Sequence, residues 1–167
     1  MRGEVERKET VFWGSIVGFF AVSLMGTACH DLYELWGSRL WVGMFAPVNE
    51  SVWEHMKLIF YPYLVFMLSE YLLYGRKING FLFNRTVGLL SGMLLIPSAF
   101  YVYTAVVGKP VFAVDLMIYY LSVGVSFYVS AVRLIRDRKD KANRNMAALV
   151  ILICFVALFS GLTFAGI

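Results

Sequence analysis

Five apolar segments of about 20 residues each constrain this chain more than any other feature of its sequence. Their expected bounds are residues 11–29, 52–74, 87–107, 111–135 and 146–166. A run of this length crosses the hydrocarbon core of a bilayer as an α-helix, whereas an open strand would leave its backbone groups unpaired in lipid. The segments also lack the alternation of a membrane β-barrel. The sequence therefore predicts an all-α polytopic membrane protein, a bundle of five transmembrane helices.

The composition agrees with this class, because 60% of the 167 residues are hydrophobic, which is too many for an ordinary soluble domain. The length allows one compact bundle, so we expect a single transmembrane domain over residues 1–167. The formal net charge is +4, but the basic residues stand in short loops between apolar segments. That placement is typical of membrane orientation. We therefore expect the lipid bilayer as a partner and no nucleic acid.

The basic loops predict how the helices are oriented. Most basic loop residues follow the second and fourth apolar segments: Arg76, Lys77, Arg85, Arg133, Arg136, Arg138, Lys139, Lys141 and Arg144. The other two loops contribute only Arg39 and Lys109. The positive-inside rule then places the N-terminus in the cytoplasm and the C-terminus outside, in a multi-pass protein of the cell's inner membrane. Near the cytoplasmic side, Glu70 is expected to reach the interface or to pair with Arg76.

The loop between the first two segments, residues 31–48, is rich in apolar and aromatic residues. Such a loop is expected to lie in the outer membrane interface or to re-enter the membrane as a short amphipathic element. It would then roof a cavity that opens outward.

Small residues at helical spacing predict close helix packing. Gly14 and Gly18 form one G-x-x-x-G motif, and Gly88 and Gly92 form another. These faces also allow a homo-oligomer.

Polar residues gather at the outer ends of the predicted helices. His30 and Asp31 follow the first segment, residues 49–57 open the second, and Asp115 lies about one turn into the fourth. The predicted topology brings these distant positions to one layer. Polar groups at this depth are costly, and they mark functional sites in membrane proteins.

Histidine and carboxylate side chains in this layer predict a metal site. His30, His55 and Glu54 are the expected ligands of a divalent ion, with zinc favoured. Glu50 and Glu54, four residues apart, would share a helix face, and either could act as general base. Five further residues are candidates to orient the metal ligands or to contact the substrate: Asn49, Asp31, Ser51, Asp115 and Lys57. The spacing is not that of an H-E-x-x-H motif, so the signal is suggestive and not diagnostic.

A purely structural interpretation explains part of this cluster. Ser51 and Glu54 fit a capping box at the start of a helix, and Asn49 is a competing N-cap. Lys57, three residues beyond Glu54, can pair with it. Capping does not explain His55 or His30, so both interpretations stay open.

The box Asn49-Glu-Ser-Val-Trp-Glu-His55, preceded by His30-Asp-Leu-Tyr33, resembles a signature of small, uncharacterised multi-pass membrane proteins of prokaryotes. That family has no assigned activity, so the resemblance implies none here. Intramembrane zinc hydrolases of the alkaline ceramidase and adiponectin-receptor group also place histidines and an acidic residue inside helices. This chain has five predicted helices instead of seven and lacks their paired histidines on a late helix, so that likeness is analogy only.

Three functions follow as hypotheses. The first is a metal-dependent hydrolase of a lipid or another membrane-soluble substrate, with metal-activated water. The second is a transporter or channel for protons, cations or a small solute, which would use the same carboxylates and histidines. The third is an accessory subunit of a membrane complex.

Overall fold

The computed structural model of this protein describes residues 2–136 and 142–165, and all its elements there are helical. Among these residues, five helices are long and apolar enough to cross a membrane, which confirms the predicted all-α polytopic bundle. The long helices are α1 (Arg2–Cys29), α5 (Lys57–Leu73), α6 (Phe81–Val107), α7 (Phe112–Arg136) and α8 (Ala142–Ala165). One turn of helix, α4 (Val52–His55), precedes α5 and belongs to the same apolar span.

Three helices begin earlier than the apolar segments that identified them. α1 begins at Arg2 instead of residue 11, α6 at Phe81 instead of residue 87, and α8 at Ala142 instead of residue 146. Hydropathy marks the part of a helix that suits lipid, whereas a helix continues through polar residues as long as its backbone hydrogen bonds continue. The expected basic residues Arg138, Lys139 and Lys141 and the expected helix end at residue 166 lie outside the described residues.

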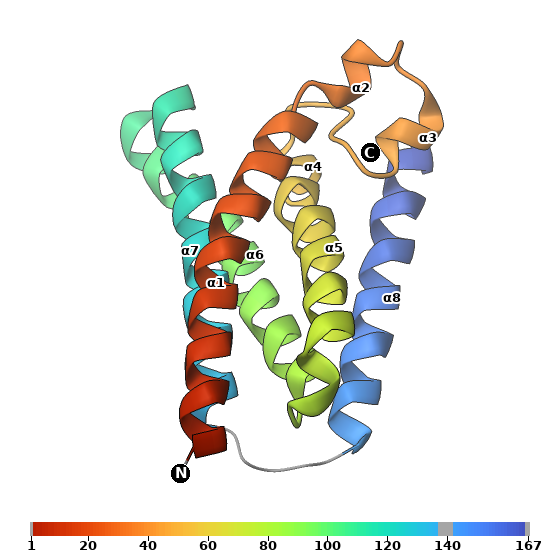
Figure 1. Cartoon of the computed structure of the whole chain (residues 1–167). Coiled ribbons are helices and arrows are strands. Elements are labelled where there is room, and N and C mark those ends of the chain that lie inside the picture. Colours follow the sequence, from red (N-terminus) through yellow and green to blue (C-terminus); the bar gives the residue numbers. More distant parts are fainter. Residues whose placement is uncertain (1, 137–141, 166–167) are drawn as a thin grey trace.

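The helices form an up-and-down bundle (Figure 1), with the N-terminus at one end and the last described turn of α8 at the other. α1 and α7 lie side by side, α5 and α6 run through the middle, and α8 stands on the opposite side. The buried core lies around α5 and includes Phe60, Tyr63, Met67 and, from α7, Phe127. The ring centroids of Tyr63 and Phe127 lie 4.7 Å apart.

The expected G-x-x-x-G positions meet other helices of the same chain. A Cβ atom added at Gly92 would overlap Ser126 of α7, and one added at Gly88 would overlap the backbone of the same residue. A Cβ at Gly14 would overlap the side chains of Tyr74 and Glu70. The glycines therefore allow neighbouring helices of one chain to approach each other closely. A homo-oligomer through these faces stays a prediction.

The segment between α1 and α4 lies across one end of the bundle (Figure 1) and contains two short helices, α2 (Leu32–Leu35) and α3 (Leu40–Gly43). Val42 and Ala46 are buried, whereas Trp36 and Trp41 are exposed and their rings meet edge to face at a centroid distance of 5.6 Å. Exposed tryptophans at the end of a transmembrane bundle suit the membrane interface.

Candidate functional site

The candidate site is built where α1 ends and α4 begins. His30 directly follows the last residue of α1, and His55 is the last residue of α4. Ser51 is the N-cap of α4, because its hydroxyl accepts the Glu54 N–H at 3.2 Å, as the capping interpretation expected. The Asn49 side chain accepts the Ser51 N–H at 2.9 Å. These local bonds fix how the chain enters the second membrane span.

Three side chains with metal-binding atoms converge there: His30, Glu50 and His55. One ligand atom from each lies within 4.8 Å of the other two. The rings of His30 and His55 have centroids 5.4 Å apart, and His55 Nε2 lies 3.4 Å from Glu50 Oε2. The Glu50 side chain is 86% exposed, so the cluster opens away from the bundle. Two histidines and one glutamate are the ligand set of one type of catalytic zinc site.

Each histidine has a hydrogen-bond acceptor at its Nδ1 atom. His30 Nδ1 lies 2.7 Å from Asp31 Oδ1, and His55 Nδ1 lies 2.9 Å from the carbonyl oxygen of Ser51. A carbonyl or carboxylate oxygen only accepts, so both Nδ1 atoms carry the proton. In a neutral ring with this tautomer the lone pair is on Nε2. Metal-ligating histidines are held in this way by a carboxylate or a backbone carbonyl.

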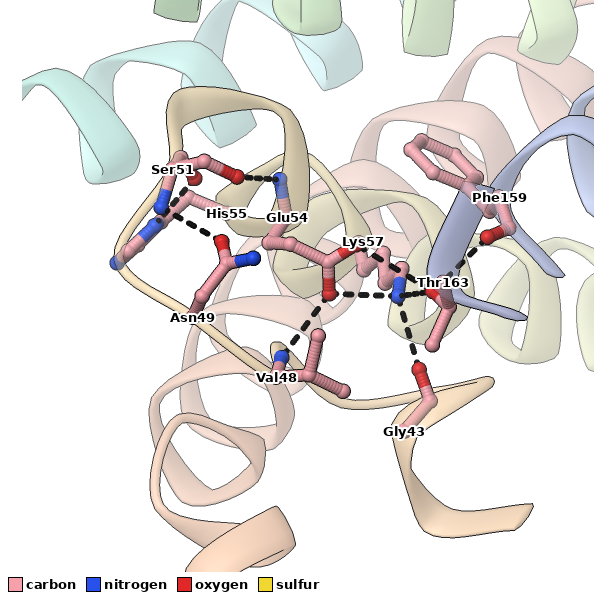
Figure 2. A network of polar contacts seen from close by, with 9 residues as sticks. All are labelled: Gly43, Val48, Asn49, Ser51, Glu54, His55, Lys57, Phe159 and Thr163. Carbon is pink, nitrogen blue, oxygen red and sulfur yellow. Dashed lines mark hydrogen bonds and ion pairs between the residues drawn. The ribbon is translucent and has the colours of Figure 1, made fainter. Parts of the chain in front are cut away.

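Glu54 does not join this cluster. It is fully buried, its Oε2 lies 2.7 Å from Lys57 Nζ, and the same oxygen accepts the Val48 N–H at 2.9 Å. Figure 2 shows Glu54 and Lys57 pointing toward Thr163, away from the His55 ring. The structure thus differs from the expectation that Glu54 is a metal ligand or a general base. The physical reason is that the buried pair with Lys57 holds the Glu54 carboxylate inside the bundle. Glu50 and Glu54 also do not share a helix face as expected, because the helix begins at Val52 and Glu50 lies before it.

The remaining expected residues have separate roles. Asp115, in α7, accepts a hydrogen bond from the Tyr103 hydroxyl of α6, and the same hydroxyl accepts the Val111 N–H at 3.1 Å. Asp115 therefore ties the α6–α7 turn and lies outside the histidine cluster. Of the other candidates, Asp31 holds His30, whereas Asn49 and Ser51 shape the helix start.

A second buried ion pair lies toward the opposite end of the bundle. Arg85 Nη2 lies 2.6 Å from Glu70 Oε1, and Arg85 Nη1 donates to Ser130 Oγ at 2.8 Å and to Ser15 Oγ at 3.2 Å. The Tyr74 hydroxyl also donates to Glu70. Burial and this hydrogen bond raise the pKa of the Tyr74 hydroxyl, which keeps it a donor.

This pair corrects the expectation that Glu70 reaches the interface or pairs with Arg76. Arg76 stands over the Tyr71 ring instead, 5.8 Å from its centroid. Arg85 is a buried helical residue and not the expected loop residue, because α6 begins at Phe81, ahead of the apolar segment that starts at residue 87. The spacing of Arg85, Gly88 and Gly92, which puts all three on one helix face, was the available signal that it faces the core.

The comparison with known families gives a match over nearly the whole chain. The sequence model of DUF6512, a family of unknown function, matches residues 4–166. This agrees with the expected resemblance to an uncharacterised family, although the match does not bear on the Asn49–His55 box. No curated protein and no solved structure matches the chain.

Proposed function

We propose that this chain, which belongs to the DUF6512 family of unknown function, is a metal-dependent membrane-embedded hydrolase. In this proposal His30, Glu50 and His55 bind one divalent ion, and zinc fits them best. The observation that carries the proposal is that both histidines have Nδ1 bonded to an acceptor, which leaves both Nε2 atoms free to bind metal beside Glu50.

Three protein ligands leave a further coordination position for water, as in catalytic zinc sites and unlike closed structural ones. A bound zinc ion would lower the pKa of that water to about 7 and so supply a nucleophile near neutral pH. Asp31 would orient His30 and raise its basicity as a ligand. Glu54 would be neither a ligand nor a general base, since its carboxylate is held by Lys57.

The position of the cluster indicates the kind of substrate. It lies at the end of the bundle, next to the segment that exposes Leu35, Trp36, Leu40 and Trp41. Exposed tryptophans of this kind lie at headgroup level in membranes. The substrate would therefore be a lipid or other amphiphile whose scissile bond lies near the headgroup. With the N-terminus in the cytoplasm, as the basic loops predict, the site would face outward.

Metal analysis of the detergent-purified protein tests this proposal. We expect about one zinc ion per chain by mass spectrometry after loading and removal of excess metal. Hydrolysis of fluorogenic lipid esters and amides should stop when a chelator removes the ion and return when zinc is added. Absence of tightly bound zinc after loading would contradict the metal site. Hydrolysis that survives complete removal of metal would contradict the mechanism.

Proton or cation transport is the second candidate, and the Glu70–Arg85 pair favours it. A continuous path needs ionisable groups at more than one level of the membrane, and this pair supplies them away from the histidine cluster. In this alternative, proteoliposomes would show a pH-dependent flux that Glu70→Gln abolishes and that Glu9→Gln, at an exposed position of α1, leaves unchanged. Equal flux in protein-free liposomes and in proteoliposomes would rule against transport.

A further inference from the structure

The buried ion pair of Glu54 and Lys57 joins three parts of the chain that are far apart in sequence. Lys57 Nζ donates to Glu54, to the Gly43 carbonyl oxygen at 2.8 Å, and to the hydroxyl of Thr163 near the end of α8. We propose that Glu54, Lys57 and Thr163 are positioning residues of the metal site, through which the end of α8 sets the affinity for metal. This inference rests on the proposed metal binding by His30, Glu50 and His55.

Glu54 is linked to Glu50 through the backbone of residues 48–51. The Glu54 carboxylate accepts a hydrogen bond from the Val48 N–H, two residues before Glu50. The Asn49 side chain accepts one from the Ser51 N–H, one residue after Glu50. Glu50 is thus the residue between two anchored points of the backbone (Figure 2 shows both anchors). Because its own side chain is exposed, the place of its carboxylate depends on that backbone.

The Lys57 ammonium group uses all its hydrogen-bond donors. An ammonium group has three protons, and the structure gives it three acceptors. All three hydrogen bonds are needed, because the Lys57 side chain is completely buried and a missing acceptor would leave a charged donor unpaired. Loss of one acceptor should therefore shift the ammonium group and, with it, the Glu54 carboxylate.

α8 contributes one of the acceptors of Lys57, the hydroxyl of Thr163. Thr163 donates its proton to the Phe159 carbonyl oxygen at 2.9 Å, which leaves its hydroxyl oxygen free to accept from Lys57. The Phe159 ring contacts Trp53 of α4, with centroids 4.9 Å apart. Both residues of α8 therefore touch the segment that contains Glu54 and His55. A displacement of α8 would therefore shift Lys57 and Trp53, and with them the Glu54 carboxylate that binds the Val48 N–H.

Thr163→Val tests the inference, because it removes the hydroxyl with little change of shape. We expect the Kd for zinc, measured by competition with a chelating dye, to rise about 10- to 100-fold, as for other residues that orient metal ligands. Thr163→Ala should give the same result, and Thr163→Ser, which keeps the hydroxyl, should bind zinc as the wild type does.

Thr104→Val is the matched control. Thr104 makes the same kind of hydrogen bond to the carbonyl oxygen four residues earlier, at 2.7 Å, but it lies near the end of α6 and does not contact Lys57 in the described structure. Thr163→Val should also unfold at a lower temperature than Thr104→Val with metal removed, because it leaves the buried Lys57 ammonium group one acceptor short. The zinc Kd is therefore measured at a temperature at which both metal-free variants are fully folded, so that a rise in Kd reports positioning and not unfolding.

The outcomes separate this inference from the proposed function. If the wild type binds zinc and the Thr163→Val and Thr104→Val proteins bind it equally well, the metal site stands and the positioning role fails. A Thr163→Ser protein as weak as Thr163→Val would also overturn it, because packing and not the hydroxyl would then be responsible. If the wild type binds no zinc, both the proposed function and the inference fail.

Discussion

Replacing His55 by alanine should remove the metal ion from the protein. The structure gives His55 the central place among the three candidate ligands, because its Nε2 faces Glu50 at 3.4 Å and its ring lies beside the His30 ring. Loss of one of three protein ligands should weaken binding by more than the roughly 10- to 100-fold that loss of an orienting residue costs. The zinc content of His55→Ala, measured after the same loading and washing as for the wild type, should therefore fall close to background.

Three further variants show whether the loss is specific to this site. His30→Ala should behave like His55→Ala, and Glu50→Gln should bind zinc weakly because a neutral amide is a poor ligand for it. Glu34→Ala removes an exposed carboxylate from α2 in the same loop, outside the cluster, and should keep the full zinc content. Wild-type zinc content in His55→Ala would mean that any bound ion is held by other residues.

Replacing Arg85 by methionine should destabilise the bundle more than a change at any exposed position. Arg85 is fully buried, and it donates to Glu70, Ser15 and Ser130 on three other helices. The variant would leave the Glu70 carboxylate buried with the Tyr74 hydroxyl as its remaining described donor. Removal of one partner of a buried ion pair costs about 3–5 kcal/mol. Thermal unfolding in detergent, followed by circular dichroism, should show a clear loss.

A double variant separates the two causes of that loss. Glu70→Gln combined with Arg85→Met removes the stranded charge, so it should recover much of the stability lost in Arg85→Met. Arg76→Met serves as the control, because Arg76 is exposed and stands over the ring of Tyr71. Equal unfolding temperatures for Arg85→Met and Arg76→Met would contradict the view that the buried pair supports the fold.

Together the two ion pairs place charge at both ends of the bundle core. α5 contributes to both, because Lys57 is its first residue and Glu70 lies in its last turn. The Glu54–Lys57 pair joins α8 and the segment before α4, whereas the Glu70–Arg85 pair joins α1, α6 and α7. Neither pair is a free acid or base at an open surface. The histidine cluster, which is open, is therefore the better place for chemistry.

The sequence by itself determined the fold class and the end of the bundle that bears the candidate site. Apolar segments of membrane-crossing length are a local property of the chain, and the five expected ones all correspond to long helices. The ends of these segments also predict that His30 and His55 lie at one level of the membrane, because both residues stand next to such ends. The start of α4 is also predictable from the sequence, since Ser51 caps this helix as the capping box predicts.

Only the tertiary structure decided which carboxylate lies beside the histidines and which charges pair. Glu50 and Glu54 are chemically the same, and the choice between them depends on the helix start and on Lys57, Gly43 and Thr163, which come together only on folding. The sequence likewise predicts Arg85 as a loop residue, whereas the fold surrounds it with Glu70, Ser15 and Ser130 from three other helices. Hydropathy and spacing describe neighbours along the chain, whereas burial and pairing of a charge depend on side chains contributed by distant segments.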